Sequence, residues 1–275
     1  MALITCENVS FSYDGNTVVS DLNFSVCTGD YLCVVGENGS GKSTLIKGLL
    51  RLKSPQSGAI RMHADLKPGE IGYLPQQTAA QKDFPAGAYE VVLSGRLGSR
   101  GILPFYSRAD KEAAVEIMKR FDIYDLAHRC YRELSGGQQQ RVLLARALCS
   151  SVPSPHKSSR IHESDGSRTD GDRTGGHAGD VHASGGVRSG GLKVLLLDEP
   201  DSGLDPVVTN DLYRQLDAIN RESGLAIIMV SHDIHGAVRN AGKILHLKNK
   251  QIFFGETRDY INTPAAAKLL KESPL

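Results

Sequence analysis

The sequence lacks the features of a membrane-spanning or exported chain. No run of about eighteen apolar residues occurs among its 275 residues, although a helix needs about that many to cross a bilayer. The first five residues, Met1 to Thr5, do not form the basic and then apolar segment of an export signal. We therefore expect a soluble intracellular protein.

Cysteine pairs and an excess of charge are also absent. The five cysteines are scattered and include no C-x-x-C, which argues against a zinc cluster or a disulfide framework and favours reduced thiols in the cytosol. The formal net charge is only +1, so the chain has no field that would recruit nucleic acid or an anionic membrane. We expect no nucleic-acid partner. The length is sufficient for a full core in one α/β domain, or in one domain with a subdomain.

The most informative segment of the chain fits the pattern G-x-x-x-x-G-K-[ST]. It follows the apolar run 31–35 and precedes the helix-like run 43–52, which is the strand, loop and helix context that this pattern needs. In such a loop backbone N–H groups surround phosphate oxygens, the lysine reaches the β- and γ-phosphates, and the serine hydroxyl reaches Mg²⁺. A chance glycine-rich turn is the alternative, and the context argues against it. The pattern predicts a nucleoside triphosphate site at Gly36, Glu37, Asn38, Gly39, Ser40, Gly41, Lys42, Ser43 and Thr44.

Two further apolar runs end in polar residues. The run 193–197 is followed by Asp198 and Glu199, and the run 225–230 is followed by Ser231, His232 and Asp233. Apolar strands separated by helices indicate a parallel sheet buried on both faces, in which ligands lie at the carboxyl ends of the strands. An acidic pair after a strand can also be a simple turn signal. With the phosphate loop upstream, we expect Asp198 to hold Mg²⁺ through water and Glu199 to act as the general base.

The other segments complete the predicted α/β pattern. Residues 4–11 and 18–26 alternate apolar and polar positions around a turn signal and read as two strands. Residues 108–129 have helix-like apolar spacing.

A Ser-, Gly-, Arg-, Asp- and His-rich stretch interrupts this pattern at residues 150–191. It holds too few aliphatic residues to offset the entropy of ordering, so we expect a disordered insertion. Four histidines within it, His156, His162, His177 and His182, could bind zinc loosely. Their spacing matches no tetrahedral site, so a solvated insertion without a metal function is the default interpretation.

The pentapeptide Leu134-Ser135-Gly136-Gly137-Gln138 discriminates among nucleotide-binding families. It opens a helix predicted at 139–148, whose first turn presents free N–H groups to an anion. In this order relative to the other motifs, it resembles the signature sequence of ATP-binding cassette (ABC) ATPases, and the resemblance covers the chain except for 150–191. It implies one domain, 1–275, with a P-loop NTPase fold: a RecA-like parallel-sheet core, an N-terminal antiparallel β subdomain and a helical signature subdomain. The implied boundaries are 1–79 and 192–275 for the core and its β part, and 80–149 for the helical subdomain.

The resemblance also implies ATP, Mg²⁺ and a role for several single residues. Tyr13 resembles the aromatic residue that stacks on adenine. Gln76 resembles the glutamine that touches Mg²⁺ and the attacking water, although the adjacent Gln77 leaves the choice between them open. His232 resembles the switch histidine at the γ-phosphate. The implied Mg²⁺ ligands are therefore Ser43, Gln76 and Asp198, and the implied catalytic residues are Glu199, His232 and Gln76.

The family resemblance implies that two copies of the chain sandwich two ATP molecules. Ser135, Gly136, Gly137 and Gln138 of one copy would close over the phosphate loop of the other. The segment Ser202-Gly203-Leu204-Asp205 resembles the family loop that couples the two active sites across the dimer. Asp201 stands where the family more often has threonine.

The segment 83–96 bears on what this ATPase would drive. Its Phe-Pro, Glu-Val-Val and Gly-Arg, together with 244–247 and 251–255, resemble the bacterial zinc and manganese importer ATPases. The implied partners are an integral membrane permease and, indirectly, a metal-binding extracytoplasmic protein, with the chain held at the cytoplasmic face of the membrane. Phe84 and Tyr89 lie in an apolar, proline-containing loop that suits a partner groove.

Other functions stay open at this point. Importers of iron chelates and cobalamin share parts of the same pattern. A soluble ABC ATPase outside transport is a second alternative. A catalytically inactive binding module is disfavoured, because Lys42, Asp198, Glu199 and His232 are all present.

Overall fold

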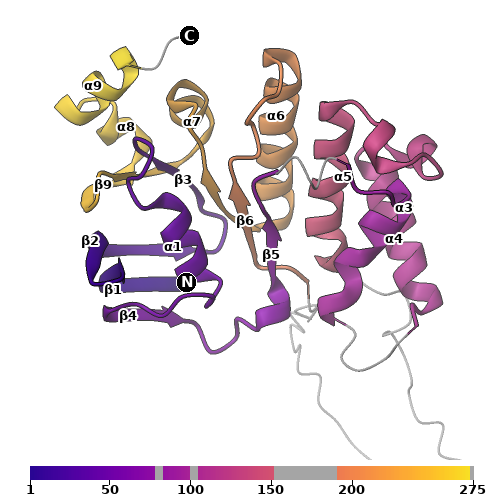
Figure 1. The fold of residues 1–275 in the computed structure, drawn as a ribbon, viewed down its shortest axis with the longest axis horizontal. Helices are drawn as coiled ribbons and strands as arrows, with labels where there is room; N and C mark the ends of the chain where they lie inside the picture. The colour runs from indigo at the N-terminus through magenta and orange to yellow at the C-terminus, as the bar shows by residue number, and fades with distance from the viewer. Residues whose placement is uncertain (78–82, 100–104, 152–190, 273–275) are drawn as a thin grey trace, which may run out of the picture.

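The structure is a computed structural model that describes residues 1–77, 83–99, 105–151 and 191–272 (Figure 1). Residues 152–190, which make up most of the predicted insertion and include its four histidines, lie outside the described residues. Within the described ranges, every helix is too short or too polar to cross a bilayer.

Nine strands are present in the described part of the chain. They are β1 Ala2–Tyr13, β2 Asn16–Cys27, β3 Tyr31–Val35, β4 Ser57–Met62, β5 Ile71–Leu74, β6 Val194–Asp198, β7 Ala226–Val230, β8 Lys243–Leu247 and β9 Gln251–Glu256.

The helices fall between and after these strands. The α-helices are α1 Lys42–Leu49, α3 Ala88–Leu93, α4 Arg108–Arg120, α5 Gly136–Leu148, α6 Pro206–Ser223, α7 Ile234–Asn240, α8 Thr257–Tyr260 and α9 Pro264–Glu272. Short 3₁₀ turns are η1 Pro68–Glu70, η2 Ser94–Ser99, η3 Tyr124–Leu126, η4 Tyr131–Glu133 and η5 Cys149–Ser151.

The larger sheet has the strand order β5-β6-β7-β3-β8-β9. All its neighbours run parallel except β8 and β9, which form an antiparallel pair at one edge. Because β3, β6 and β7 are adjacent, the segments that follow them leave the same edge of the sheet. The order therefore brings the phosphate loop, Asp198-Glu199 and Ser231-His232 together, as the sequence predicted.

Alternating side chains of the larger sheet enter two separate cores. Along β3, Tyr31, Cys33 and Val35 belong to a core shared with α3 to α7, whereas Leu32 and Val34 belong to a core shared with α1, β1 and β2. This period of two is the pleat of a strand buried on both faces. The all-apolar strands are thus explained by two covered faces.

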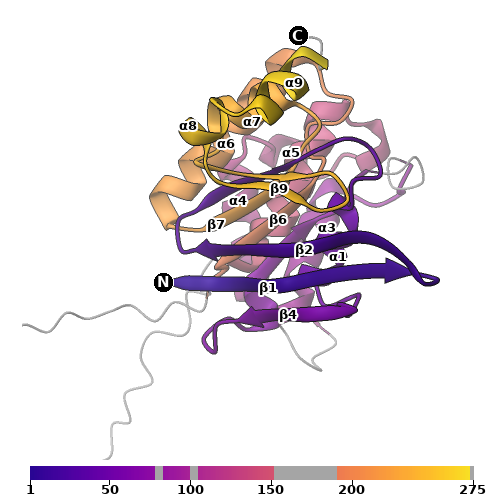
Figure 2. The same cartoon turned by 90° about the vertical axis from the view of Figure 1, so that its left-hand side faces the viewer.

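The second sheet is antiparallel, with the order β2-β1-β4. Figures 1 and 2 show it on the side of α1 that faces away from the larger sheet, so that α1 is packed between the two sheets. The N-terminal strands predicted at 4–11 and 18–26 are confirmed, each extended by a few residues. This arrangement is the predicted fold class: a parallel α/β core with an antiparallel β part and a group of helices.

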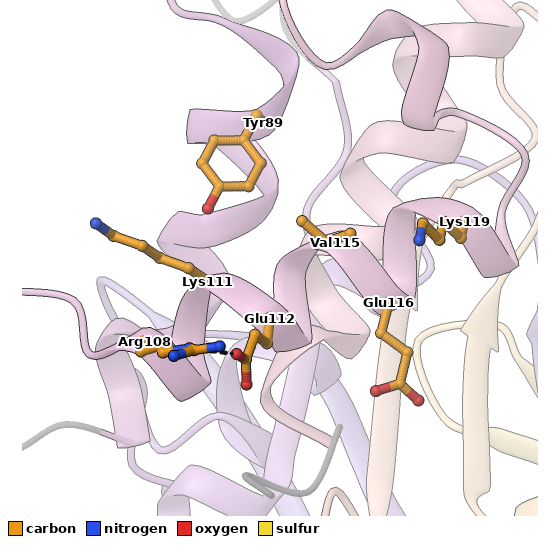
Figure 3. A pocket seen from close by; sticks show the side chains of 7 residues that line it. All are labelled: Tyr89, Arg108, Lys111, Glu112, Val115, Glu116 and Lys119. Atoms are coloured by element: carbon orange, nitrogen blue, oxygen red, sulfur yellow. Dashed lines mark hydrogen bonds and ion pairs between the residues drawn. The ribbon is translucent and has the colours of Figure 1, made fainter.

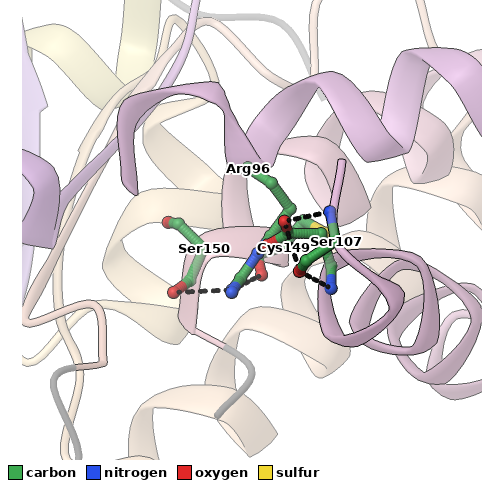
Figure 4. Close-up of polar contacts among 5 residues, drawn as sticks. Arg96, Ser107, Cys149 and Ser150 are labelled. Carbon is green, nitrogen blue, oxygen red and sulfur yellow. Dashed lines mark hydrogen bonds and ion pairs between the residues drawn. The ribbon is translucent and has the colours of Figure 1, made fainter. Parts of the chain in front are cut away.

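Helices α3, α4 and α5 form that group on the far side of the larger sheet from β1 and β2 (Figure 1). A buried guanidinium joins its parts (Figure 4). Arg96 Nε donates to Asp110 Oδ1 at 2.9 Å, and its Nη1 donates to the carbonyl oxygens of Cys149 (3.1 Å) and Ser150 (3.4 Å). The second oxygen of Asp110 accepts from the backbone N–H and the hydroxyl of Ser107 at the start of α4. One side chain therefore connects η2, α4 and η5, the turn that follows α5.

The single long helix expected at 108–129 is wrong in its second half. Helix α4 ends at Arg120, and Asp122 adopts a left-handed backbone with φ 53°. A residue in that conformation breaks the helical hydrogen-bond pattern. The later apolar residues of the pattern, such as Leu126, pack against the helical core from η3 instead.

Candidate nucleotide site

The loop between β3 and α1 can be built only with glycine at two positions. Gly36 has φ 148°, and a Cβ there would lie 2.2 Å from the carbonyl oxygen of Leu247. Gly41 has φ 100°, and a Cβ there would lie 2.7 Å from Val19 Cβ. Both backbone angles are costly for residues with a side chain. The glycines of the pattern are therefore explained by sterics before any ligand is considered.

Lys42, the first residue of α1, folds back over this loop. Its Nζ donates to the carbonyl oxygens of Gly36 (2.7 Å) and Glu37 (2.9 Å). Burial lowers the pKa of Lys42, and the nearby charges of Glu199 and Asp198 oppose that shift. The ammonium is thus held inside the loop, beside two carboxylates.

A hollow of about 200 Å³ opens at the loop. Its lining consists of Val18, Asn38, Gly39, Gly41, Lys42, Ser43, Thr44, Glu199 and His232. Ser43 is exposed at this hollow, whereas Lys42 and Thr44 are buried. Six of the nine sequence-predicted loop residues therefore share one depression with Glu199 and His232, each of which follows the end of a strand.

Two buried polar atoms at this site are without a hydrogen-bond partner. They are Ser40 Oγ and Asp198 Oδ1. An unpaired buried polar atom is costly, so such atoms commonly mark a place where a ligand or ion completes the pairing. A phosphate group and Mg²⁺ supply a matching acceptor and cation. The residues present therefore fit a magnesium nucleotide.

Glu199 lies at the centre of the predicted catalytic residues. Gln76 Nε2 donates to its Oε2 at 2.6 Å, and His232 Nε2 lies 2.5 Å from its Oε1. Glu199 also has φ 49°. This left-handed conformation is rare for residues other than glycine and is found preferentially at functional sites. Gln77 is directed elsewhere, since its Nε2 donates to the Tyr131 hydroxyl at 2.6 Å. This geometry favours Gln76 over Gln77 for the glutamine role.

Asp198 is buried at the end of β6, one residue before Glu199. Burial raises the pKa of Asp198, and the charge of Glu199 raises it further, while Lys42 and His232 lower it. A bound divalent cation would stabilise the ionised carboxylate in this position.

Tyr13 ends β1 with 40% of its surface exposed. The ammonium of Lys53 lies 3.7 Å from the centre of its ring, within the range of a cation–π contact. The sequence reasoning missed Lys53, because forty residues separate it from Tyr13 and no local pattern connects them.

Ser135 and Asp205 both cap helices. Ser135 Oγ accepts from the N–H of Gln138 (3.4 Å), and Gln138 Oε1 accepts from the N–H of Ser135 (3.0 Å), which is a reciprocal capping box at the start of α5. Asp205 Oδ1 accepts from Val207 N and Val208 N at the start of α6. Gly136 and Gly137 occupy the first turn of α5. None of these predicted residues lines the hollow at Lys42.

Phe84 and Tyr89 line two different hollows. Phe84 lines one of about 590 Å³ with Pro75, Ala86, Glu90, Val91, Ser94, Tyr131, Leu143 and Arg146. Tyr89 lies on α3, not in a loop, and borders an open depression of about 460 Å³ along α4 that is rich in charged side chains (Figure 3). Apolar residues predominate in the lining at Phe84, as the sequence predicted for this segment, whereas charged residues predominate in the lining at Tyr89.

The fold and the loop geometry define a P-loop nucleotide-binding protein. A profile of the ABC transporter family matches residues 19–153, and a profile of an AAA domain matches residues 98–235. The zinc uptake system ATP-binding protein ZurA of Listeria innocua is 30% identical over 264 residues, which cover 94% of this chain and 87% of that protein. The chain therefore belongs to the ABC transporter ATP-binding family.

Other comparisons agree. The manganese transport system ATP-binding protein MntB of Bacillus subtilis is 31% identical over 93% of this chain and 87% of that protein. Among solved structures, an inward-facing ABC transporter described as metal-chelate type has a chain with a TM-score of 0.76 and 27% identity, covering all of this chain and 90% of that chain. The resemblance to ABC ATPases drawn from the sequence is thus confirmed.

Proposed function

We propose that this chain is the ATP-hydrolysing subunit of an ABC importer for zinc or manganese. The observation that carries the ATPase part is the contact of Glu199 with both Gln76 and His232 beside the phosphate loop. The metal part rests on relatives of about 30% identity that are named for zinc or manganese uptake.

The chain's own residues supply the steps of hydrolysis. Lys42 leaves its two backbone acceptors and binds the β- and γ-phosphates, while the loop N–H groups hold the remaining oxygens. Ser43, Gln76 and Asp198 would hold Mg²⁺, which neutralises phosphate charge when bound. Glu199 accepts a proton from the attacking water, and His232 orients Glu199 and contacts the γ-phosphate.

A single variant tests the assignment of the base. Glu199→Gln keeps the size of the side chain and its contact with Gln76 but removes its basicity. ATP turnover should fall at least about a hundredfold, while ATP binding, measured by fluorescence of a labelled analogue, stays within a factor of about two. Turnover at the parent rate would move the role to another residue.

The depression at Phe84 supports docking of a permease. Phe84 is 54% exposed and borders a mainly apolar hollow next to Pro75, which directly precedes Gln76. A partner segment seated there would contact the backbone that carries Gln76. Phe84→Asp should abolish co-purification with the permease and leave ATP binding intact, because it places a charge in an apolar contact.

The cargo is tested with the assembled transporter. The permease that co-purifies with this chain from native membranes is reconstituted in vesicles with its extracytoplasmic binding protein. ATP-dependent uptake of zinc or manganese is the expected result. The likeness to a metal-chelate transporter favours iron chelates as the second candidate, and chelate uptake without free-metal uptake would replace the proposal by that one.

A further inference from the structure

Asp201, two residues after Glu199, links the loop behind the proposed base to the loop that carries His232. Its Oδ2 accepts a hydrogen bond from Ser231 Oγ at 2.5 Å and another from the Tyr213 hydroxyl at 3.1 Å. The two hydroxyls lie 3.4 Å from each other. Ser231 directly precedes His232, so the carboxylate is two residues from Glu199 along the chain and is hydrogen-bonded to the neighbour of His232.

Two of the three residues in this link are shielded from solvent. Ser231 is 1% exposed and Tyr213 is 3% exposed, whereas Asp201 is half-buried. Burial raises the pKa of Asp201, the hydrogen bonds from Ser231 and Tyr213 lower it, and the charge of Asp233 raises it. A half-buried carboxylate is tolerated where donors of this kind pair with it.

Ser231 passes the constraint on to the start of α7. Its Oγ accepts from the N–H of Asp233 at 2.9 Å, and Asp233 Oδ1 accepts from the N–H of Gly236 at 2.8 Å. A Cβ at Gly236 would lie 2.2 Å from Asp233 Oδ2 and 2.8 Å from the Tyr213 hydroxyl. The turn that carries His232 is thus hydrogen-bonded to Asp201 through Ser231, and the start of α7 that follows it packs tightly against the Tyr213 hydroxyl.

We propose that Asp201 is a positioning residue for ATP hydrolysis: its carboxylate, through Ser231 and Tyr213, holds the turn bearing His232 in contact with Glu199. The inference rests on the proposed function, since it concerns the geometry of that hydrolytic pair. Asp201 itself does not line the hollow at Lys42. Its removal should therefore lower kcat and leave the binding of ATP nearly unchanged, because the phosphate loop is untouched.

Three variants test this role in the full-length chain. Asp201→Ala removes the oxygen that accepts both hydrogen bonds and should lower kcat at least about tenfold, with KM for ATP within a factor of about two. Asp201→Asn keeps an accepting oxygen and should restore kcat to within about threefold of the parent. Tyr213→Phe removes one donor, keeps the ring in the core, and should lower kcat by a few-fold at unchanged KM.

The matched control is Asp259→Asn, an exposed residue on α8, which should keep the parent kcat. If Asp201→Ala does not fold, as judged by circular dichroism, Tyr213→Phe decides the question. The positioning role would be overturned by parent kcat in folded Asp201→Ala, or by parent kcat in Tyr213→Phe where Asp201→Ala does not fold. A lower melting temperature at unchanged kcat would overturn it as well. A parent protein without any ATP hydrolysis would instead overturn the proposed function, and this inference would fall with it.

Discussion

At the scale of single residues, Asp198 combines a buried carboxylate with an unpaired oxygen. Its pKa is raised above the ordinary value of 3.8 by burial and by Glu199. A carboxyl whose pKa is higher in the folded than in the unfolded chain stabilises the fold most at acid pH, and this contribution falls as the pH rises through the folded pKa. At neutral pH the ionised, buried Asp198 therefore lowers the stability of the nucleotide-free fold.

Replacing this carboxyl should make the nucleotide-free protein more stable. Asp198→Asn removes the buried charge, while Lys42 keeps its two backbone acceptors. Without nucleotide or Mg²⁺ at neutral pH, the melting temperature should rise by about 2–4 °C, which corresponds to about 1 kcal/mol for a domain of this size. The difference from the parent should shrink as the pH is lowered toward 4, measured by calorimetry. An equal difference at both pH values would contradict the buried-charge explanation.

Contacts between residues far apart in the sequence were harder to predict than local motifs. The phosphate loop follows from a contiguous pattern, and its surroundings from the order of apolar strands. The contacts of Asp201 with Tyr213 and Ser231, and of Lys53 with Tyr13, join residues 12 to 40 positions apart. Such pairs depend on tertiary packing, which no spacing in the sequence encodes.

At the scale of elements, a buried ion pair joins η2 to α4 within the helical group. The side chains of Arg96 and Asp110 are 7% and 9% exposed. Arg96→Ala would leave the buried Asp110 carboxylate without its cationic partner, a change that typically costs about 3–5 kcal/mol. We expect a fall in the melting temperature of roughly 10 °C, measured by calorimetry.

A surface arginine on α4, the helix that carries Asp110, provides the control for this prediction. Arg108 pairs with Glu112 one helical turn away, and its side chain is 85% exposed (Figure 3). Arg108→Ala should leave the melting temperature within about 1 °C of the parent, since exposed pairs contribute little. Equal effects of the two variants would show that the Arg96 link does not hold the group together.

Helix boundaries show where the sequence pattern was sufficient and where it was not. Ser135 and the two glycines were expected to open a helix at 139–148, and the capping box of Ser135 and Gln138 starts α5 at Gly136, so both glycines belong to the helix itself. The reciprocal cap with Gln138 fixes the first helical residue directly after Ser135. In α4 the apolar periodicity continued past a left-handed residue, Asp122, whose φ no apolar pattern reveals.

The cap of α5 separates a structural role from a ligand role. Ser135→Ala removes the side-chain acceptor and should cost about 1 kcal/mol of stability. Ser135→Asp keeps the cap and favours the helix dipole, but it places a negative charge where the second subunit's γ-phosphate is expected. We expect parent-like melting for Ser135→Asp together with a loss of ATP turnover of at least tenfold. Full turnover in Ser135→Asp would argue against an anion at this helix end.

At the scale of the whole molecule, the phosphate loop and the helix end at Ser135 do not line a common hollow within the described part of a single chain. Among the described residues, the lining of the hollow at Lys42 comes from the phosphate loop, Val18 and two strand ends. Ser135 and the first turn of α5 belong to the helical group, with β5, β6 and α6 between that group and α1 (Figure 1). This separation supports two composite sites, each built from the phosphate loop of one copy and the signature of the other.

Mixing two inactive variants tests this arrangement directly. Lys42→Ala removes the phosphate-binding ammonium, and Ser135→Asp repels the phosphate, so each homodimer carries two defective sites. In a mixed dimer both defects fall in the same site, which leaves the other with an intact loop and an intact signature. Equal amounts of the two variants should therefore recover up to about one quarter of the parent turnover per subunit, because half of the dimers are mixed and one of their two sites is intact. The measurement is steady-state ATP hydrolysis after subunit exchange. The control is the double variant Lys42→Ala/Ser135→Asp mixed with Lys42→Ala, because every site in that mixture keeps a Lys42 defect. Turnover in the first mixture no higher than in this control would place both motifs in the same subunit's site.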